Sequence, residues 1–221
     1  MPASRSILDM ALPAFCAGCD VEGVALCSSC RRSLDVRLGL PPGVPLGLKA
    51  VMPLPLAQLE WCAPFSGVVR ASLHRLKYSG EKRLSLPLGE AMATRWRAVG
   101  AGGELLVPVP VHASRARVRG FDQAILLARV AARSLGLPCL VALERSRNTA
   151  PQFDLGRGER RANVHGAFSL RGSTDVLAVR GRWVVLVDDV VTTGSTLVAC
   201  ADALYEAGAV AGSALTVSRE R

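Results

Sequence analysis

An acidic pair followed by a hydroxyl-rich turn is the part of this sequence best suited to chemistry. Asp188 and Asp189 come directly after the apolar run 183–187, and a turn around one glycine follows them. The turn contains Thr192, Thr193, Gly194, Ser195 and Thr196. Where a helix begins, backbone N–H groups and the helix dipole bind phosphate, and a glycine allows close approach. Since the carboxylates are left for sugar hydroxyls, the segment predicts a site for a phosphorylated sugar.

Four cysteines form a second candidate site near the start of the chain. They make two Cys-x-x-Cys pairs with a short gap between them, at Cys16, Cys19, Cys27 and Cys30. Two such pairs can present four thiolates to a tetrahedral Zn²⁺, which supplies folding free energy to a module too small for its own core. The alternatives are two vicinal disulfides, which a reducing cytosol disfavours, or free thiols in a loop.

Arginine is concentrated in the middle of the chain. Residues 112–161 contain ten Arg and four Asp or Glu, in a chain whose net charge is +9. Because guanidinium groups grip phosphate in two places, we expect contacts to pyrophosphate or to a nucleic acid backbone. The candidates are Arg115, Arg117, Arg119, Arg157, Arg160 and Arg161. A coding bias is the alternative, since Arg outnumbers Lys 24 to 3 throughout, and no cluster of aromatic residues predicts base stacking.

Strands and amphipathic helices alternate around these residues. Continuous β-branched, apolar runs at 105–111 and 183–187 predict strands buried on both faces of a parallel sheet. Apolar spacing predicts helices over 66–77, 82–97 and 121–135 and from 197 to a stop at Gly208, then a last strand over 209–218. Pro64 makes 60–65 an edge strand. Ligands of open α/β sheets bind outside the carboxyl ends of strands, so the acidic pair faces a site.

Two smaller groups of polar residues have more than one interpretation. Lys77 and Tyr78 lie between the first two predicted helices and are either ligand contacts or a solvated helix end. His74, His112 and His165 have no spacing typical of a metal site or a catalytic triad, although His112 lies close to the candidate Arg115. We therefore assign no chemistry to them from the sequence.

Composition indicates one α/β domain with a small appendage. Half of the 221 residues are hydrophobic, which excludes disorder. We expect a zinc-binding module over 1–37, a Pro/Gly-rich linker or cover over 38–58, and the main domain over 59–221. Cys62, Cys139 and Cys200 lie in apolar surroundings and are predicted to be small core residues. No apolar stretch approaches the roughly 20 residues of a membrane span, and the N-terminus makes a poor signal peptide, so a cytoplasmic location without membrane insertion is expected.

Several segments together resemble one family. The segment VVLVDDVVTTGST resembles the phosphoribosyl pyrophosphate (PRPP) loop of type I phosphoribosyltransferases. Three other features accompany this loop: the paired cysteines and the segments PVPVHASRARVRGFDQA and RSRNTAPQFDLGRGERRANVHGAF. The four features follow one another in the same order as in the competence protein F family of phosphoribosyltransferase-like proteins, which the chain therefore resembles. The resemblance implies a type I phosphoribosyltransferase-like parallel sheet with flanking helices, a PRPP-like ligand and a zinc module. Members of that family are associated with uptake of single-stranded DNA in natural transformation.

These features give three hypotheses about function. In the first, the chain transfers phosphoribose from PRPP to an unknown acceptor, with the 5-phosphate on the turn, the ribose hydroxyls at the acidic pair and Mg²⁺ held through the substrate phosphates. We expect residues before Glu60 to cover the acceptor, since little chain follows the last strand. The second is a non-catalytic accessory protein that binds single-stranded DNA. The third is a regulator that binds PRPP or a nucleotide without turnover.

Overall fold

A parallel sheet forms the centre of the protein. The computed structural model describes residues 14–43, 56–111, 120–145 and 167–220. Four parallel strands lie in the order β1-β6-β5-β2, namely β1 (Leu56–Pro64), β6 (Ala211–Arg219), β5 (Trp183–Val191) and β2 (Leu105–Pro108). The predicted α/β fold with a parallel sheet is confirmed, and the strand that contains Pro64 lies at an edge, as expected.

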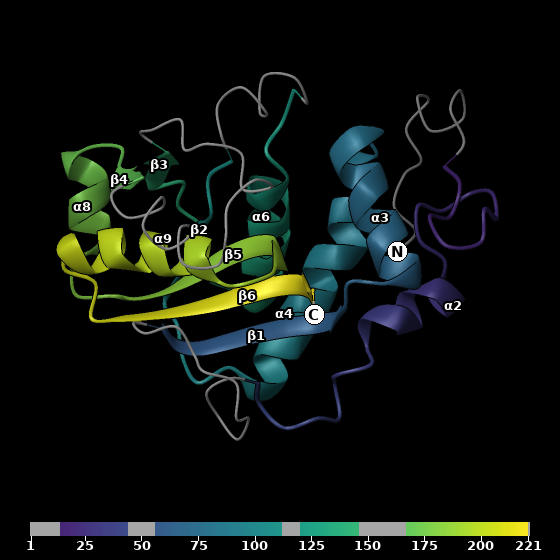
Figure 1. The fold of residues 1–221 in the computed structure, drawn as a ribbon, viewed down its shortest axis with the longest axis horizontal. Coiled ribbons are helices and arrows are strands. Elements are labelled where there is room, and N and C mark those ends of the chain that lie inside the picture. The colour runs from purple at the N-terminus through teal and green to yellow at the C-terminus, as the bar shows by residue number, and fades with distance from the viewer. Residues whose placement is uncertain (1–13, 44–55, 112–119, 146–166, 221) are drawn as a thin grey trace.

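Helices cover both faces of this sheet. Helices α4 (Ser85–Val99) and α6 (Gln123–Leu135) contact one face, and α9 (Ser195–Glu206) contacts the other (Figure 1). The apolar run of β5 therefore serves two cores: Val184 and Leu186 pack into the core that contains α9, while Val185 and Val187 pack into the core that contains α4 and α6. This double burial explains why the run is apolar at consecutive positions.

The helix predictions hold with small shifts. Helix α3 (Gly67–Tyr78) buries Val69, Leu73 and Leu76, as its apolar spacing predicts, but the side chain of Ser66 makes no capping hydrogen bond. A short 3-10 turn, η2 (Lys82–Leu84), precedes α4, and α6 ends at Gly136 with φ 72°. The sequence analysis missed helix α8 (Ser173–Val179) and the antiparallel pair of β3 (Leu143–Arg145) and β4 (Phe168–Leu170).

The N-terminal module packs on the main domain. It contains α2 (Ser28–Arg31) and the 3-10 turn η1 (Arg32–Leu34), and it lies beside α3 at the end of the sheet where β1 and β6 finish (Figure 1). Arg75 of α3 donates hydrogen bonds to Asp20 at 2.6 Å and to the carbonyl of Phe15 at 3.3 Å. A Cβ on Gly18 would lie 2.9 Å from Val68, so the two chain segments are in close contact there.

A buried ion pair fixes the segment that leaves this module. Glu60 of β1 and Arg95 of α4 are 0% and 1% exposed, and Arg95 Nε donates to Glu60 Oε2 at 3.0 Å. The guanidinium also donates to the carbonyls of Leu40 and Pro41, each at 2.9 Å. Because a buried charge is costly without full pairing, these bonds hold Leu40 and Pro41 close to α4.

Candidate functional site

The acidic pair and the turn come together at the carboxyl end of β5. The strand runs past both aspartates to Val191, and α9 begins after Gly194. Gly194 has φ 79°, in the left-handed region that favours glycine, so the residue is required for the turn itself. Thr193 Oγ1 lies 2.9 Å from Ser195 Oγ, and the exposed residues Thr192 and Thr193 face solvent. The turn therefore opens the helix with accessible hydroxyls, as the sequence predicts.

The two carboxylates occupy different surroundings. Asp188 is partly buried, and its Oδ1 accepts a hydrogen bond from the backbone N–H of Asp189 at 2.8 Å. Asp189 is 5% exposed and forms an ion pair with the ammonium group of Lys77. The charge of Asp189 acts on the carboxyl of Asp188. The ion pair with Lys77 joins Asp189 of β5 to the end of α3.

Lys77 belongs to this site, although it was not assigned to it from the sequence, and Asp122 lies at the start of α6. Lys77 is the ambiguous residue of the sequence analysis, and its ion pair with Asp189 excludes a purely solvated helix end. Asp122 caps α6 by accepting the backbone N–H of Ala124 at 2.8 Å, and its charge acts on that of Asp189. An aspartate just before an apolar helical run is a cap signal that could have identified this residue.

The acidic pair does not fit a directly bound Mg²⁺. Mg²⁺ requires oxygen ligands in a near-octahedral arrangement. It is also repelled by any other cation that is bound to the same carboxylate. Asp189, the more buried of the two, already has the Lys77 ammonium as its partner. Direct coordination would therefore require this ion pair to break.

Asp188 makes stability depend on pH. Burial raises the pKa of the Asp188 carboxyl well above its ordinary value, the charge of Asp189 raises it further, and the charge of Lys77 lowers it. As pH rises above about 4, the unfolded chain loses this proton more readily than the folded chain, so stability falls.

We expect Asp188→Asn to raise the melting temperature near pH 8 and to change it little near pH 4, because asparagine keeps the shape without the charge. A gain of about 1 kcal/mol raises the melting temperature by roughly 2–4 °C in a chain of this size. Thermal unfolding of both proteins between these pH values measures the difference. A variant less stable than wild type at high pH would contradict the expectation.

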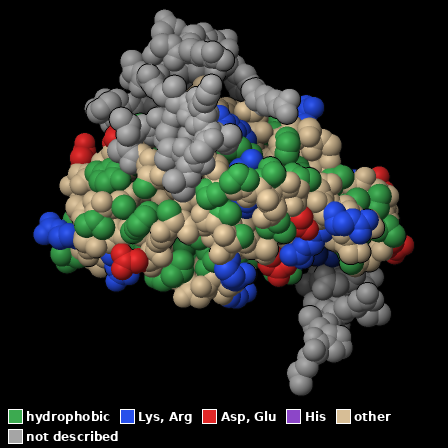
Figure 2. Space-filling model, turned by 90° about the horizontal axis from the view of Figure 1, so that it is seen from below, with side chains coloured by type: hydrophobic (Ala, Val, Ile, Leu, Met, Phe, Trp, Pro, Cys, Tyr) green, Lys and Arg blue, Asp and Glu red, His purple; other side chains and the backbone are tan. Residues whose placement is uncertain are grey.

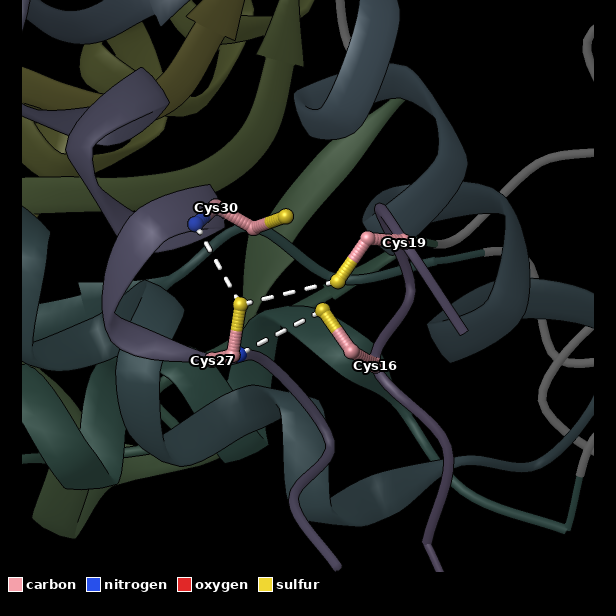
Figure 3. Close-up of side chains that lie close together, drawn as sticks. All are labelled: Cys16, Cys19, Cys27 and Cys30. Atoms are coloured by element: carbon pink, nitrogen blue, oxygen red, sulfur yellow. Dashed lines mark hydrogen bonds between the residues drawn. The ribbon is translucent and has the colours of Figure 1, made fainter. Parts of the chain in front are cut away.

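The four N-terminal cysteines form one cluster. Their sulfur atoms all lie within 4.8 Å of one another and converge on a common space (Figure 3). Cys19 Sγ and Cys27 Sγ are 3.7 Å apart, far longer than a disulfide but close to the edge of about 3.8 Å expected for a tetrahedron with Zn–S distances near 2.3 Å. Four thiolates at this spacing fit a structural zinc ion.

Backbone groups support the thiolates of this cluster. Burial raises the pKa of the Cys16 thiol, but N–H donation to its sulfur from Cys27 at 3.4 Å and from Gly18 at 3.5 Å outweighs burial and lowers the pKa to about 6. Burial and the neighbouring thiols raise the pKa of Cys30 to about 12. One thiol thus ionises readily, and a metal would be needed to deprotonate the other at neutral pH.

The remaining predicted residues are distributed as follows. Cys62 and Cys200 are buried core residues, as expected, and Cys139 is partly buried. The arginine candidates 115, 117, 119, 157, 160 and 161 lie outside the described residues. On the face of the molecule that Figure 2 shows, the coloured Lys and Arg side chains are scattered, with Asp and Glu side chains between them. Within the described part of the chain, no helix is long and apolar enough to cross a membrane.

Known proteins share the sequence of these segments. Residues 122–221 match the phosphoribosyl transferase domain family. The chain is 32% identical over 200 residues to the DNA utilization protein YhgH of Salmonella typhi, covering 83% of this chain and 86% of that protein. It is 33% identical over 202 residues to YhgH of Escherichia coli K12, covering 84% and 86%. Over 95 residues it is 42% identical to competence protein F of Haemophilus influenzae, covering 42% of this chain and 41% of that protein.

Among solved structures, a glutamine PRPP amidotransferase from B. subtilis matches with 22% identity and a TM-score of 0.43, covering 65% of this chain and 30% of that one. The two YhgH relatives match over most of both chains, and the matching domain family spans β5, the acidic pair and the turn. This chain therefore belongs to the competence protein F family of phosphoribosyltransferase-like proteins.

Proposed function

We propose that the chain binds PRPP and transfers its phosphoribosyl group to an acceptor. The proposal rests on one observation: the turn at Gly194, which opens α9, follows directly after β5, the strand that carries Asp188 and Asp189. The turn would hold the 5-phosphate through backbone N–H groups, while the carboxylates would accept hydrogen bonds from the ribose hydroxyls. Membership of a phosphoribosyltransferase-like family supports both assignments.

The charges of the site suit cleavage of the bond between ribose and pyrophosphate. In that step positive charge develops on the sugar and negative charge on the leaving group. Asp188 and Asp189 would stabilise the sugar, and candidate arginines such as Arg115 and Arg157 would contact the pyrophosphate. Mg²⁺, when bound, would neutralise charge on the substrate phosphates, which are its usual ligands. The reaction requires no covalent nucleophile.

The N-terminal module would complete the site on the acceptor side. The module packs on α3, and the same helix places Lys77 at Asp189. The position of the module would therefore affect the acidic pair through α3. We propose residues 1–37 as the zinc-binding module and the segment up to residue 58 as a cover of the main domain 59–221. The buried bonds of Arg95 to Leu40 and Pro41 support the role of a cover.

Calorimetry with PRPP tests this function. With Mg²⁺ present we expect one PRPP to bind per chain, and at about 100 times the dissociation constant the ligand stabilises the fold by about 2.7 kcal/mol. Release of pyrophosphate in the presence of candidate amines would then show turnover. Saturable binding without pyrophosphate release would favour a PRPP-binding regulator. No heat and no stabilisation at millimolar PRPP would exclude a PRPP site.

Binding of single-stranded DNA is a second candidate function, because full-length relatives are named DNA utilization proteins and residues 112–161 carry ten Arg. If these arginines bind the phosphate backbone, affinity should fall steeply with salt, and each contact removed should lower the log-log slope by about 0.7. Fluorescence titration of an oligonucleotide at several salt concentrations measures this slope. A flat response would leave PRPP binding as the remaining function.

A further inference from the structure

Lys77 is placed at the acidic pair by two parts of the fold. Its helix, α3, is fixed to the core by the fully buried Leu73 and Leu76, and to the N-terminal module by the bond of Arg75 to Asp20. The last turn of that helix delivers the ammonium to Asp189 Oδ2. The Lys77 side chain is 19% exposed and that of Asp189 is 7% exposed, so the pair is shielded from water.

Shielding makes this ion pair hard to replace. Removing one partner of a buried pair leaves an uncompensated charge, which is more costly than the pair itself. A divalent cation could reach Asp189 only by displacing the ammonium or by lying beside it, and two cations at one carboxylate repel each other strongly at low dielectric.

Without its lysine, the same place would attract a metal. Asp188 and Asp189 are consecutive residues of β5, and the charge of Asp189 acts on the carboxyl of Asp188. Carboxylate oxygens are the ligands that Mg²⁺ and Mn²⁺ prefer. The ammonium of Lys77 therefore decides whether this group of oxygens binds a metal ion or a neutral partner.

We propose that Lys77 is the resident cation of the acidic pair and excludes free divalent metal from it, so that the carboxylates select the hydroxyls of a sugar. A metal ion would then enter only on the phosphates of the ligand. This assignment makes Lys77 a residue that determines specificity, and it deepens the proposed function. Its test uses metal alone, so it can fail or succeed independently of PRPP binding.

The experiment measures Mn²⁺ binding to the zinc-loaded, full-length protein by electron paramagnetic resonance of the free ion. We expect no specific site in wild type at submillimolar Mn²⁺. Lys77→Met should gain one site, with affinity at least about tenfold above wild type, and Mn²⁺ should raise its melting temperature. Lys77→Arg, which keeps the charge, and Lys82→Met, which removes a lysine outside the acidic pair, should both behave like wild type.

A further variant locates the new site. Adding Asp189→Asn to Lys77→Met should abolish the gained Mn²⁺ binding, because a carboxylate ligand is lost. If Lys77→Met does not fold, Lys77→Gln provides a polar replacement with the same expected gain. The proposal is overturned if wild type already binds one Mn²⁺ that Asp189→Asn removes, or if the folded Lys77 variants bind Mn²⁺ no more tightly than wild type.

Discussion

Replacing Cys27 by serine is expected to remove bound zinc and to lower the melting temperature by roughly 10 °C or more. Structural zinc supplies folding free energy directly, and a loss of about 3–5 kcal/mol corresponds to this shift at roughly 2–4 °C per kcal/mol. Cys27 is central to the cluster, since its sulfur lies 3.7 Å from that of Cys19 and its backbone N–H donates to the sulfur of Cys16. Elemental analysis and thermal unfolding provide the two measurements.

Cys139→Ser is the matched control for this variant. Cys139 is also partly buried, but it lies outside the four-sulfur cluster. Its substitution should leave about one zinc per chain and cause a much smaller change in stability. Zinc-free wild-type protein, or a Cys27→Ser variant with full zinc content, would contradict a zinc site made of the four cysteines.

Replacing Asp188 and Asp189 together by asparagine is expected to weaken PRPP binding by about 100-fold or more. Each hydrogen bond to a charged group contributes about 1.5–3 kcal/mol, and the substitution retains the shape of both side chains while removing their charge. Asparagine at position 188 also removes a carboxyl whose raised pKa reflects costly burial. Asparagine at position 189 leaves the Lys77 ammonium without its partner, so some stability should be lost together with binding. Titration calorimetry and thermal unfolding of the same samples separate the two effects.

Two further variants give this prediction its controls. Asp175→Asn changes an aspartate in the first turn of α8, outside the acidic pair, and should bind PRPP like wild type. Gly194→Val should lose both binding and stability, because valine is strained at φ 79° and blocks the approach of phosphate to the turn. A double aspartate variant that binds as tightly as wild type would remove the acidic pair from the site.

The sequence by itself determined the local parts of this protein. The apolar run before the acidic pair, the glycine at the start of α9 and the spacing of the cysteines each act within one short segment, where side-chain type fixes the backbone directly. Gly136 ends α6 at φ 72° for the same reason. These features predicted the parallel sheet, the turn that opens a helix and the cluster of four sulfurs.

Contacts between distant segments were decided only by the tertiary structure. Nothing local distinguishes Lys77 from a solvated helix end or Arg95 from a surface arginine, since each has its partner on another element. The packing of helices on the ordered strands brings the end of α3 to β5 and places α4 against β1, and this topology pairs Lys77 with Asp189 and Arg95 with Glu60. The role of each of these charges depends on burial next to an opposite charge that is far away in the sequence. Hydrophobic periodicity contains no information about which distant residue that partner is.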